Sequence, residues 1–390
     1  MRQERLKPFV KWLAERQGSA ADIGELHQAL CRLLNNLGYG LWKSGLLLET
    51  LDPEFSGGRT IWSRDGIEEL ALTLNPHTLD MSAQYARSPL KIVDETGHTL
   101  RARLDGSVLS LPLFEELRAE GGTDYMIVPL AFIDRRRSAG LSFTTDTPGG
   151  FTEEDVNELE IIATLISATL EVRLLRHIAI NLLETYVGPQ AGASILDGSI
   201  KRGDGGRMRA VIWYSDLRNF TRLTETMETG ELLDLLNEYF DLVGSAATKR
   251  GGEVVQHIGD AIMIYFTIPD GSTDGQVTAG VLDAVAETLV GLDAANEGRR
   301  ARGVAEIKCG VGLDIGQVTH GNVGSLRRLS FNVVGPAVNR AARIETLTKA
   351  LGTPMLMSAD FARTTGRPWL SAGWHALKGV PDPVEIARLP

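Results

Sequence analysis

The sequence predicts an α+β protein with two separately folded halves and a long helix between them. Beyond position 207 the expected elements follow the order strand, helix, hairpin, helix, strand, strand, helix, which is a βαββαβ ferredoxin-like plan. The 390 residues also exceed the roughly 250 to 300 that one hydrophobic core supports. We therefore expect an N-terminal domain over 1–172, a linker helix and glycine-rich hinge over 173–206, and a C-terminal domain over 207–390.

Charge and cysteine content exclude several classes of protein. A formal net charge of −10 argues against a general nucleic-acid surface, although single nucleotides remain compatible with it. Cys31 and Cys309 are the only cysteines and have no partner at metal-ligand spacing, so neither a disulfide framework nor a zinc site is indicated. No secretory signal is visible, and the longest apolar run, 161–170, is too short to span a bilayer. We expect a soluble cytoplasmic protein without a membrane span.

The first domain begins with a helix followed by strands. Apolar residues recur at helical spacing over 21–36, and Gly38 and Gly40 then end that helix. The segments 45–51 and 59–62 are rich in strand-forming residues and predict two neighbouring strands.

A hairpin and a long helix complete this domain. The runs 125–132 and 140–145 predict the hairpin, and its charged tip, 134–138, is expected to face solvent. Thr152 and Asp155 match a capping box, and the helical pattern that starts there persists to about Tyr186. Apolar residues recur along it at three- and four-residue steps: Val156, Leu159, Ile162, Ile166, Leu170, Leu174, Ile178 and Leu182. This spacing predicts a helix that first packs on its own domain and then pairs with a second copy.

The end of the first domain resembles a known sensor module. The sequence Gly-Leu-Ser-Phe-Thr-Thr-Asp-Thr-Pro-Gly-Gly-Phe-Thr-Glu-Glu-Asp-Val, followed by a long helix, resembles the closing portion of a GAF-type domain. The resemblance covers mainly 125–173 and implies a GAF-like α/β sensor domain, but it names no ligand. Gly188-Pro189 ends the long helix, and the glycine-rich segment 188–206 predicts a hinge.

Two aspartates mark the chemistry of the second domain. Val211 to Tyr214 predict a buried strand that leaves Asp216 at a junction between strand and helix. The segment 253–266 predicts two strands joined by a Gly-Asp turn that exposes Asp260. If the two strands are neighbours, the carboxylates converge and repel each other unless a divalent cation lies between them. Taken singly, a helix cap and a turn residue remain equally good interpretations.

A later helix adds polar groups of a different kind. Strand 329–334 leads to Gly335-Pro336, which opens a helix with proline at its first position. Asn339 and Arg343 lie four residues apart and share one face, so together they can orient a sugar and clamp a phosphate. Gly310 and Gly312 give only a weak match to a dinucleotide loop, because no helix opens within the glycine run, which leads instead to Gly316 and to a turn expected over 321–324.

These segments closely resemble the catalytic domain of class III nucleotidyl cyclases. The match extends over nearly all of 209–389 and is carried by Asp-Leu-Arg-Asn-Phe-Thr from 216, His-Ile-Gly-Asp-Ala-Ile-Met from 257, Val-Val-Gly-Pro-Ala-Val-Asn-Arg-Ala-Ala-Arg from 333 and Leu-Lys-Gly from 377. The resemblance implies that two Mg²⁺ or Mn²⁺ ions per site are held by Asp216, Asp260 and the Leu217 carbonyl. It further implies that Asn339 positions the ribose, Arg343 stabilises the α-phosphate and Lys378 meets the terminal phosphates.

Other candidate substrate contacts leave the choice of base open. The family's base-reading positions hold Gln256 and Asn332, whose amides can satisfy either purine edge. Phe220 and Thr221 belong to the first metal-binding motif, and Arg327 is a weaker candidate that could equally be a hairpin-tip charge.

The resemblance implies an ATP cyclase that forms 3′,5′-cyclic AMP and works as a head-to-tail homodimer with active sites at the interface. A guanylyl or dual-specificity cyclase is the nearest alternative. A second alternative is a catalytically silent regulatory module that binds nucleotide. A third is a metal-dependent phosphodiesterase or nuclease, but such an enzyme needs an activated water and usually more His or Asp ligands than this sequence offers.

Overall fold

The computed structural model describes residues 4–16, 22–52, 55–64, 69–76, 82–104, 106, 111–133, 138–269, 271–325 and 327–390. The chain divides into two compact units, Met1–Leu182 and Leu183–Pro390. Each unit has its own sheet and its own hydrophobic cores, and the mixed α+β class expected from the sequence is confirmed.

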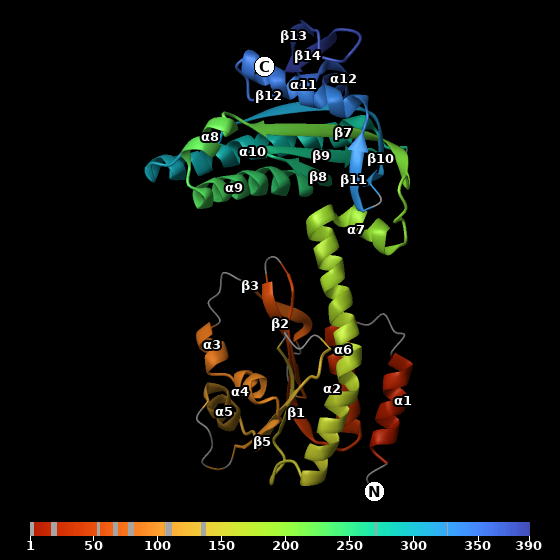
Figure 1. Cartoon of the computed structure of the whole chain (residues 1–390), viewed down its shortest axis with the longest axis vertical. Coiled ribbons are helices and arrows are strands. Elements are labelled where there is room, and N and C mark those ends of the chain that lie inside the picture. The colour runs from red at the N-terminus through yellow and green to blue at the C-terminus, as the bar shows by residue number, and fades with distance from the viewer. Residues whose placement is uncertain are drawn as a thin grey trace. The chain divides into compact units, whose positions relative to one another are not determined.

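The described strands of the N-terminal unit form a six-stranded antiparallel sheet in the order β3-β2-β1-β6-β5-β4 (Figure 1). The strands are β1 (Leu41–Glu49), β2 (Phe55–Ser63), β3 (Glu69–Pro76), β4 (Leu100–Arg103), β5 (Asp124–Pro129) and β6 (Ala139–Thr145). The two expected neighbours are β1 and β2, and the expected hairpin is β5 with β6. Four residues of its charged tip, 134–137, lie outside the described residues.

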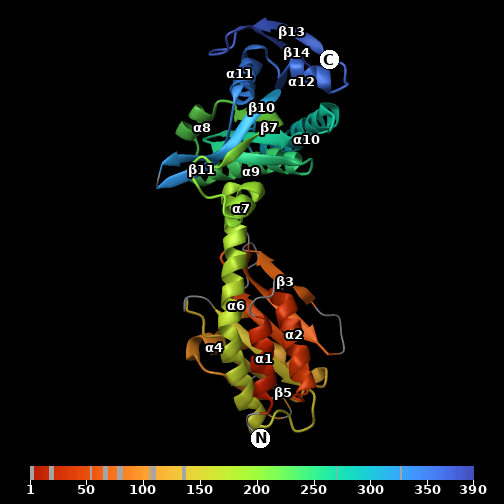
Figure 2. The same ribbon diagram turned by 90° about the vertical axis from the view of Figure 1, so that its right-hand side faces the viewer.

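Helices cover both faces of this sheet. Helices α1 (Leu6–Arg16), α2 (Ile23–Asn36) and α6 (Glu153–Val187) lie side by side on one face, as both views show (Figures 1 and 2). The other face carries α3 (Ser82–Ala86), α4 (Pro89–Thr96) and α5 (Pro112–Ala119). Buried apolar side chains fill both layers, with the larger core under α2 and α6 and a smaller one between the sheet, α4 and α5.

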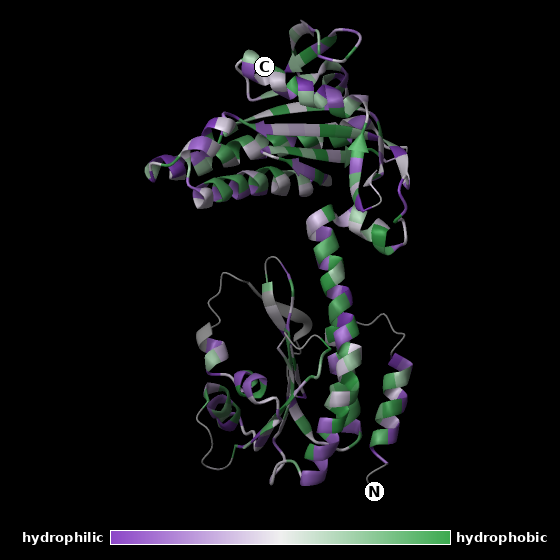
Figure 3. Ribbon diagram, in the orientation of Figure 1, coloured by the Kyte–Doolittle hydropathy of each residue, from purple (hydrophilic) through white to green (hydrophobic). Residues whose placement is uncertain are grey.

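Helix α6 starts and ends where the sequence predicts. Thr152 accepts a hydrogen bond from the Asp155 amide at 3.1 Å, and its own amide donates to the Asp155 carboxylate at 3.0 Å, so the expected capping box is present. The apolar stripe from Leu159 to Ile178 is buried in the core of the N-terminal unit. The residues from Leu159 to Ile178 therefore pack within their own unit, so this set of side chains is not available to a second copy. Figure 3 shows further apolar residues along the rest of the helix.

The described strands of the C-terminal unit form an eight-stranded sheet with the expected βαββαβ order at its centre. Its main path is β13-β14-β12-β10-β7-β9-β8, and β11 pairs with β10. The strands are β7 (Gly205–Leu217), β8 (Gly252–Ile258), β9 (Ala261–Thr267), β10 (Cys309–Ser325), β11 (Arg328–Val334), β12 (Met355–Ser358), β13 (Leu370–His375) and β14 (Val384–Arg388). Strand β7 is central because it pairs with β10 on one side and β9 on the other.

Helices pack on both faces of this sheet as well. The helices are α7 (Pro189–Leu196), α8 (Phe220–Thr226), α9 (Thr229–Thr248), α10 (Asp274–Ala301), α11 (Pro336–Ala350) and α12 (Ala359–Thr364). Helices α9 and α10 bury one face of β7, β9 and β10, whereas α11 packs on the opposite face (Figure 1). The central strand is thus buried on both sides, which fixes the position of its carboxyl end.

Two local expectations differ from the structure. Helix α7 lies inside the segment predicted as a hinge, because Pro189 starts a helix and Gln190 accepts a hydrogen bond from the Tyr265 hydroxyl at 2.9 Å. The expected turn at 321–324 is absent, since β10 continues through it and pairs with β11. Gly321 is needed there for a different reason: a Cβ would overlap the carbonyl of Asp204 on the neighbouring chain segment. Among the described residues, none of the helices combines the length and apolar character that crossing a bilayer requires.

Candidate active site

Asp216 and Asp260 come from neighbouring strands of the C-terminal sheet. Asp216 is the penultimate residue of β7, and its partner in β9 is Ala261. Asp260 directly precedes Ala261 in the turn that joins β8 to β9, where Gly259 has a φ of +66° that favours glycine. The two side chains lie close enough for Asp260 to raise the pKa of Asp216. The topology therefore brings together two acidic groups that are 44 positions apart in the printed sequence.

This proximity changes the acidity of the pair. Burial, the hydrogen bond to Asp260 and the negative charge of Asp260 raise the pKa of Asp216 from 3.8 to about 7. Glu345 raises that pKa further, and the guanidinium of Arg218 opposes the change. A divalent cation bound by both carboxylates would offset this repulsion and take the place of the proton that the raised pKa of Asp216 favours.

The donor atoms suit a hard divalent cation. The carboxylates of Asp216 and Asp260 are oxygen donors, and the backbone of Leu217 follows directly at the end of β7. No cluster of three or more His, Cys, Asp or Glu side chains that could hold a metal occurs in the described parts of the chain. The residues present therefore fit an ion such as Mg²⁺ that takes its remaining ligands from water or phosphate.

The chain turns sharply just after the first aspartate. Asn219 has a φ of +61° and is the one non-glycine residue with a left-handed backbone among the described residues. Asparagine tolerates this conformation better than most residues. The turn starts α8, directs Phe220 against the main core and leaves Thr221 exposed. Strained backbone of this kind is common at functional sites, and here it fixes the exit of the chain from the aspartate pair.

Helix α11 presents a polar face and an apolar face. Asn339 and Arg343 are exposed on one face, as their spacing predicts. Ala337, Ala341 and Ile344 face the sheet and are fully buried. The amide and the guanidinium are therefore displayed by a helix whose other face is anchored in the core.

The remaining candidates are placed on separate elements. Gln256 lies in β8 next to a register shift, and Asn332 lies in β11 with its side-chain oxygen bonded to the Val333 amide at 2.8 Å. Lys378 is exposed in the connection between β13 and β14, and Arg327 is exposed at the tip between β10 and β11. Within the described part of one chain, neither hydrogen bonds nor ion pairs link these four residues, Asn339 or Arg343 to Asp216 or Asp260.

Sequence reasoning missed two ion pairs under α11. Arg218 Nη1 lies 3.0 Å from Glu345 Oε1, and Arg340 Nε lies 2.6 Å from Asp314 Oδ2. Burial raises the pKa of Asp314 to about 6 and raises the pKa of Glu345, while the paired guanidinium opposes each change. Arg218 lies in the motif that starts at 216, and Arg340 lies in the motif that starts at 333. Membership of these motifs was the only sequence signal that pointed to the two arginines. Their partners lie far away in sequence and have no local pattern.

Comparison with known proteins assigns this unit to a family. Residues 207–359 match the family described as adenylate and guanylate cyclase catalytic domain. The matched part of the C-terminal unit belongs to this family and is called the cyclase domain below. The chain is 36% identical over 174 residues to an adenylate cyclase of Anabaena cylindrica and 30% identical over 153 residues to adenylate cyclase 1 of Rhizobium meliloti. It also resembles the crystal structure of the adenylyl cyclase CyaB from P. aeruginosa, with 26% identity, a TM-score of 0.41, and coverage of 47% of this chain and 94% of that one.

The matches to the two adenylate cyclases of Anabaena and Rhizobium concern only part of each protein. They cover 44% and 39% of this chain, but only 33% of the Anabaena protein and 23% of the Rhizobium protein. The family therefore describes the cyclase domain, and the expected class of catalytic domain is confirmed for it. The N-terminal unit takes no assignment from these matches.

Proposed function

We propose that the chain is a nucleotidyl cyclase that converts ATP to 3′,5′-cyclic AMP and pyrophosphate. The observation that carries this proposal is the Asp216–Asp260 pair, held at the end of the central strand of a cyclase-family domain. A silent regulatory module would not need to retain these carboxylates together with Asn339 and Arg343. A phosphodiesterase or nuclease would need a site for an activated water, and the described residues offer no larger ligand cluster for one.

The residues of the chain have distinct roles in this proposal. The ribose 3′-oxygen forms a bond to the α-phosphorus, the bond from that phosphorus to the bridging oxygen breaks, pyrophosphate leaves, and the hydroxyl loses its proton. Bound Mg²⁺ or Mn²⁺, two per site, would lower the pKa of the hydroxyl and neutralise the leaving group. Asp216, Asp260 and the Leu217 carbonyl would hold these ions. Arg343 stabilises charge on the phosphoryl oxygens, and Asn339 orients the ribose.

The remaining polar groups complete the substrate contacts. Lys378 is exposed and can reach solvent-facing terminal phosphates, and Arg327, Phe220 and Thr221 stay weaker candidates. Gln256 and Asn332 read the base through amides that donate and accept alike. We favour ATP because the similar adenylate cyclases act on it, with GTP as the second candidate, and we expect modest discrimination between them.

We further propose that two chains assemble each site. The exposed position of Asn339 and Arg343 on α11, on a different element from the aspartate pair at the end of β7, is compatible with this arrangement. In a two-fold dimer, Asp216 and Asp260 of one chain would face Asn339, Arg343 and Lys378 of the other. One chain alone would then be inactive.

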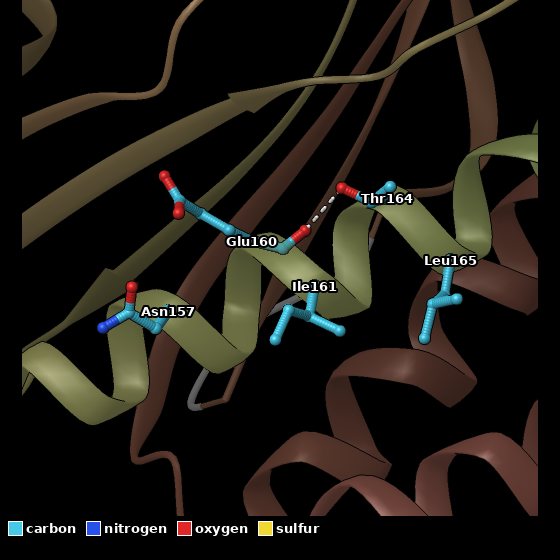
Figure 4. Close-up of a pocket in the computed structure, with 5 residues that line it drawn as sticks. All are labelled: Asn157, Glu160, Ile161, Thr164 and Leu165. Atoms are coloured by element: carbon cyan, nitrogen blue, oxygen red, sulfur yellow. Dashed lines mark hydrogen bonds between the residues drawn. The ribbon is translucent and has the colours of Figure 1, made fainter.

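A second apolar stripe on α6 supports the same dimer. We call it the α6 seam, and its members repeat every 3.5 residues: Ile161, Leu165, Ala168, Val172, Leu175, Ala179, Leu182 and Tyr186. Seven of them are exposed, with Val172 at 66% and Tyr186 at 77%. Ile161 and Leu165 project to the same side of the helix (Figure 4). Strict 3.5-residue spacing is typical of coiled coils, so the occupant that fits is α6 of a second copy.

The N-terminal unit would then regulate the cyclase domain. Its sheet, covered on both faces by helices, and its continuation into α6 are compatible with the GAF-like sensor role suggested by the sequence. A change in the pairing of the α6 seam would alter how two cyclase domains meet.

A product assay tests the proposed function. Purified protein is incubated with ATP or GTP and Mn²⁺, and the products are separated by chromatography. Cyclic AMP is the expected main product. A linear monophosphate or diphosphate would instead indicate a hydrolase, and nucleotide binding without any product would indicate a silent module.

A further inference from the structure

An ion pair connects the end of β7 to the middle of α11. Arg218 follows Asp216 by two positions, and its main-chain amide donates to the Lys308 carbonyl at 2.7 Å. Its guanidinium binds the Glu345 carboxylate at 3.0 Å and also donates to the Thr348 hydroxyl. Only 19% of the Arg218 side chain and 5% of the Glu345 side chain are exposed. The contact is therefore shielded from water, where breaking one partner is costly.

The packing around this pair is unusually close. Gly310 of β10 lies directly beneath it, and a Cβ there would overlap the side chains of Arg218, Glu345 and Thr348. At Gly312 a Cβ would overlap the backbone of α11 at Ala341 and Glu345. These two glycines let α11 approach β10 and leave the space that the ion pair fills. The glycine pair thus serves helix packing.

We propose that Arg218 and Glu345 are positioning residues that hold the metal-binding turn and α11 in one fixed arrangement. At one end of this ion pair, Arg218 follows Asp216 by two positions. At the other end, Glu345 lies about half a helical turn beyond Arg343 on α11. Arg218 also balances a buried carboxylate, Glu345, whose charge would otherwise add to that of the two aspartates. In the proposed dimer, the connection joins the metal half of one site to the phosphate half of the other.

This inference rests on the proposed function, and three variants test it by steady-state kinetics. Arg218→Met should lower kcat about 10- to 100-fold with little change in KM, because displaced catalytic groups lose contacts made in the transition state. Glu345→Gln in the Arg218→Met background should recover part of that loss, because it removes the unbalanced charge. Arg218→Lys should retain an intermediate rate, since it keeps the charge but not the two-pronged geometry.

A glycine substitution tests the same contact without removing a charge. Gly310→Ala should reproduce the kinetics of Arg218→Met, because the new methyl group occupies the space of the ion pair. Gly316→Ala on the same strand is the matched control, since its Cβ would approach Ala337 at 3.3 Å and Arg340 at 3.4 Å but neither Arg218 nor Glu345. The control for a lost ion pair is Arg299→Met, whose 2.5 Å contact with Glu238 joins α10 to α9. Both controls should retain kcat.

Hydrogen exchange of the metal-free protein separates this inference from the proposed function. Arg218→Met should speed amide exchange in both 217–223 and 336–350, whereas Arg299→Met should leave both segments unchanged. An active wild type with normal kcat in Arg218→Met and Gly310→Ala overturns the inference. A wild type that forms no cyclic nucleotide overturns the proposed function, and the exchange result then decides the inference alone: unchanged exchange at α11 refutes it.

Discussion

Replacing Asp260 with asparagine should stabilise the metal-free cyclase domain and abolish catalysis. The native structure forces Asp260 against Asp216, and burial together with this neighbour raises the pKa of Asp216 from 3.8 to about 7. A shift of about three units corresponds to roughly 4 kcal/mol. Asp216 is only half-buried and burial persists in the variant, so screening reduces the expected gain to about 1 to 2 kcal/mol. In a domain of this size that gain corresponds to a Tm increase of roughly 2 to 8 °C.

The change in Tm caused by Asp260→Asn should depend on pH. The folded-state pKa of Asp216 lies above its unfolded value, so the stability that its proton contributes is present below about pH 4 and is lost as pH rises through about 7. Asp260→Asn should therefore raise Tm at pH 8 and leave it nearly unchanged at pH 4. Thermal unfolding without metal measures both values. Asp241→Asn, an exposed substitution on α9 with the same charge change, is the control.

Metal addition completes this test. Mn²⁺ with a non-reactive ATP analogue should raise the Tm of the wild type but not of Asp260→Asn, because a ligand stabilises only the state that binds it. The reasoning is refuted if Asp260→Asn lowers Tm at pH 8, or if it keeps the shift with Mn²⁺ and normal turnover.

Three further predictions concern other parts of the chain. Gln256→Lys combined with Asn332→Asp should raise the ATP-to-GTP ratio of kcat/KM about tenfold, because a fixed donor and a fixed acceptor cannot flip; an unchanged ratio places base reading elsewhere. Glutamate at Leu165 and Leu175 should weaken self-association in analytical ultracentrifugation and lower activity, whereas glutamate at an exposed apolar residue of α10 should do neither. Complete burial between Ser44 and Thr60 lowers the pKa of His27 to about 3, so the N-terminal unit should lose about 1.4 kcal/mol per pH unit as pH falls below 6.5; urea unfolding of His27→Gln should lack that loss.

Much of the fold could be predicted because its signals are local. The Gly-Asp turn between two apolar runs identified the β8–β9 hairpin, and Thr152 with Asp155 identified the start of α6. The aspartate pair could also be anticipated, since a strand end and an adjacent hairpin turn meet once the strands are neighbours. Local patterns were sufficient wherever neighbours in space were close in sequence or joined by a regular hairpin.

The errors arose where a pattern allowed two interpretations. Two apolar stripes run along α6, and the sequence alone does not show that the Leu159 stripe is buried while the Leu165 stripe is exposed. The ion pair of Arg218 with Glu345 joins positions 127 apart, and neither residue stands out in its local context. Gly310 invited comparison with nucleotide loops, although its role is to make room for that ion pair. Such contacts depend on the assembled tertiary structure.

Complementation between two inactive chains tests the central claim most directly. Asp216→Ala and Arg343→Ala chains with different tags are co-expressed, purified through both tags and assayed for cyclic nucleotide formation. If each site takes its metal ligands from one chain and Arg343 from the other, a mixed dimer has one site with both lesions and one intact site. Each mixed dimer should then show about half of the wild-type activity, and an unsorted mixture about a quarter, under two-fold symmetry. A doubly tagged dimer that forms but remains inactive would contradict the account.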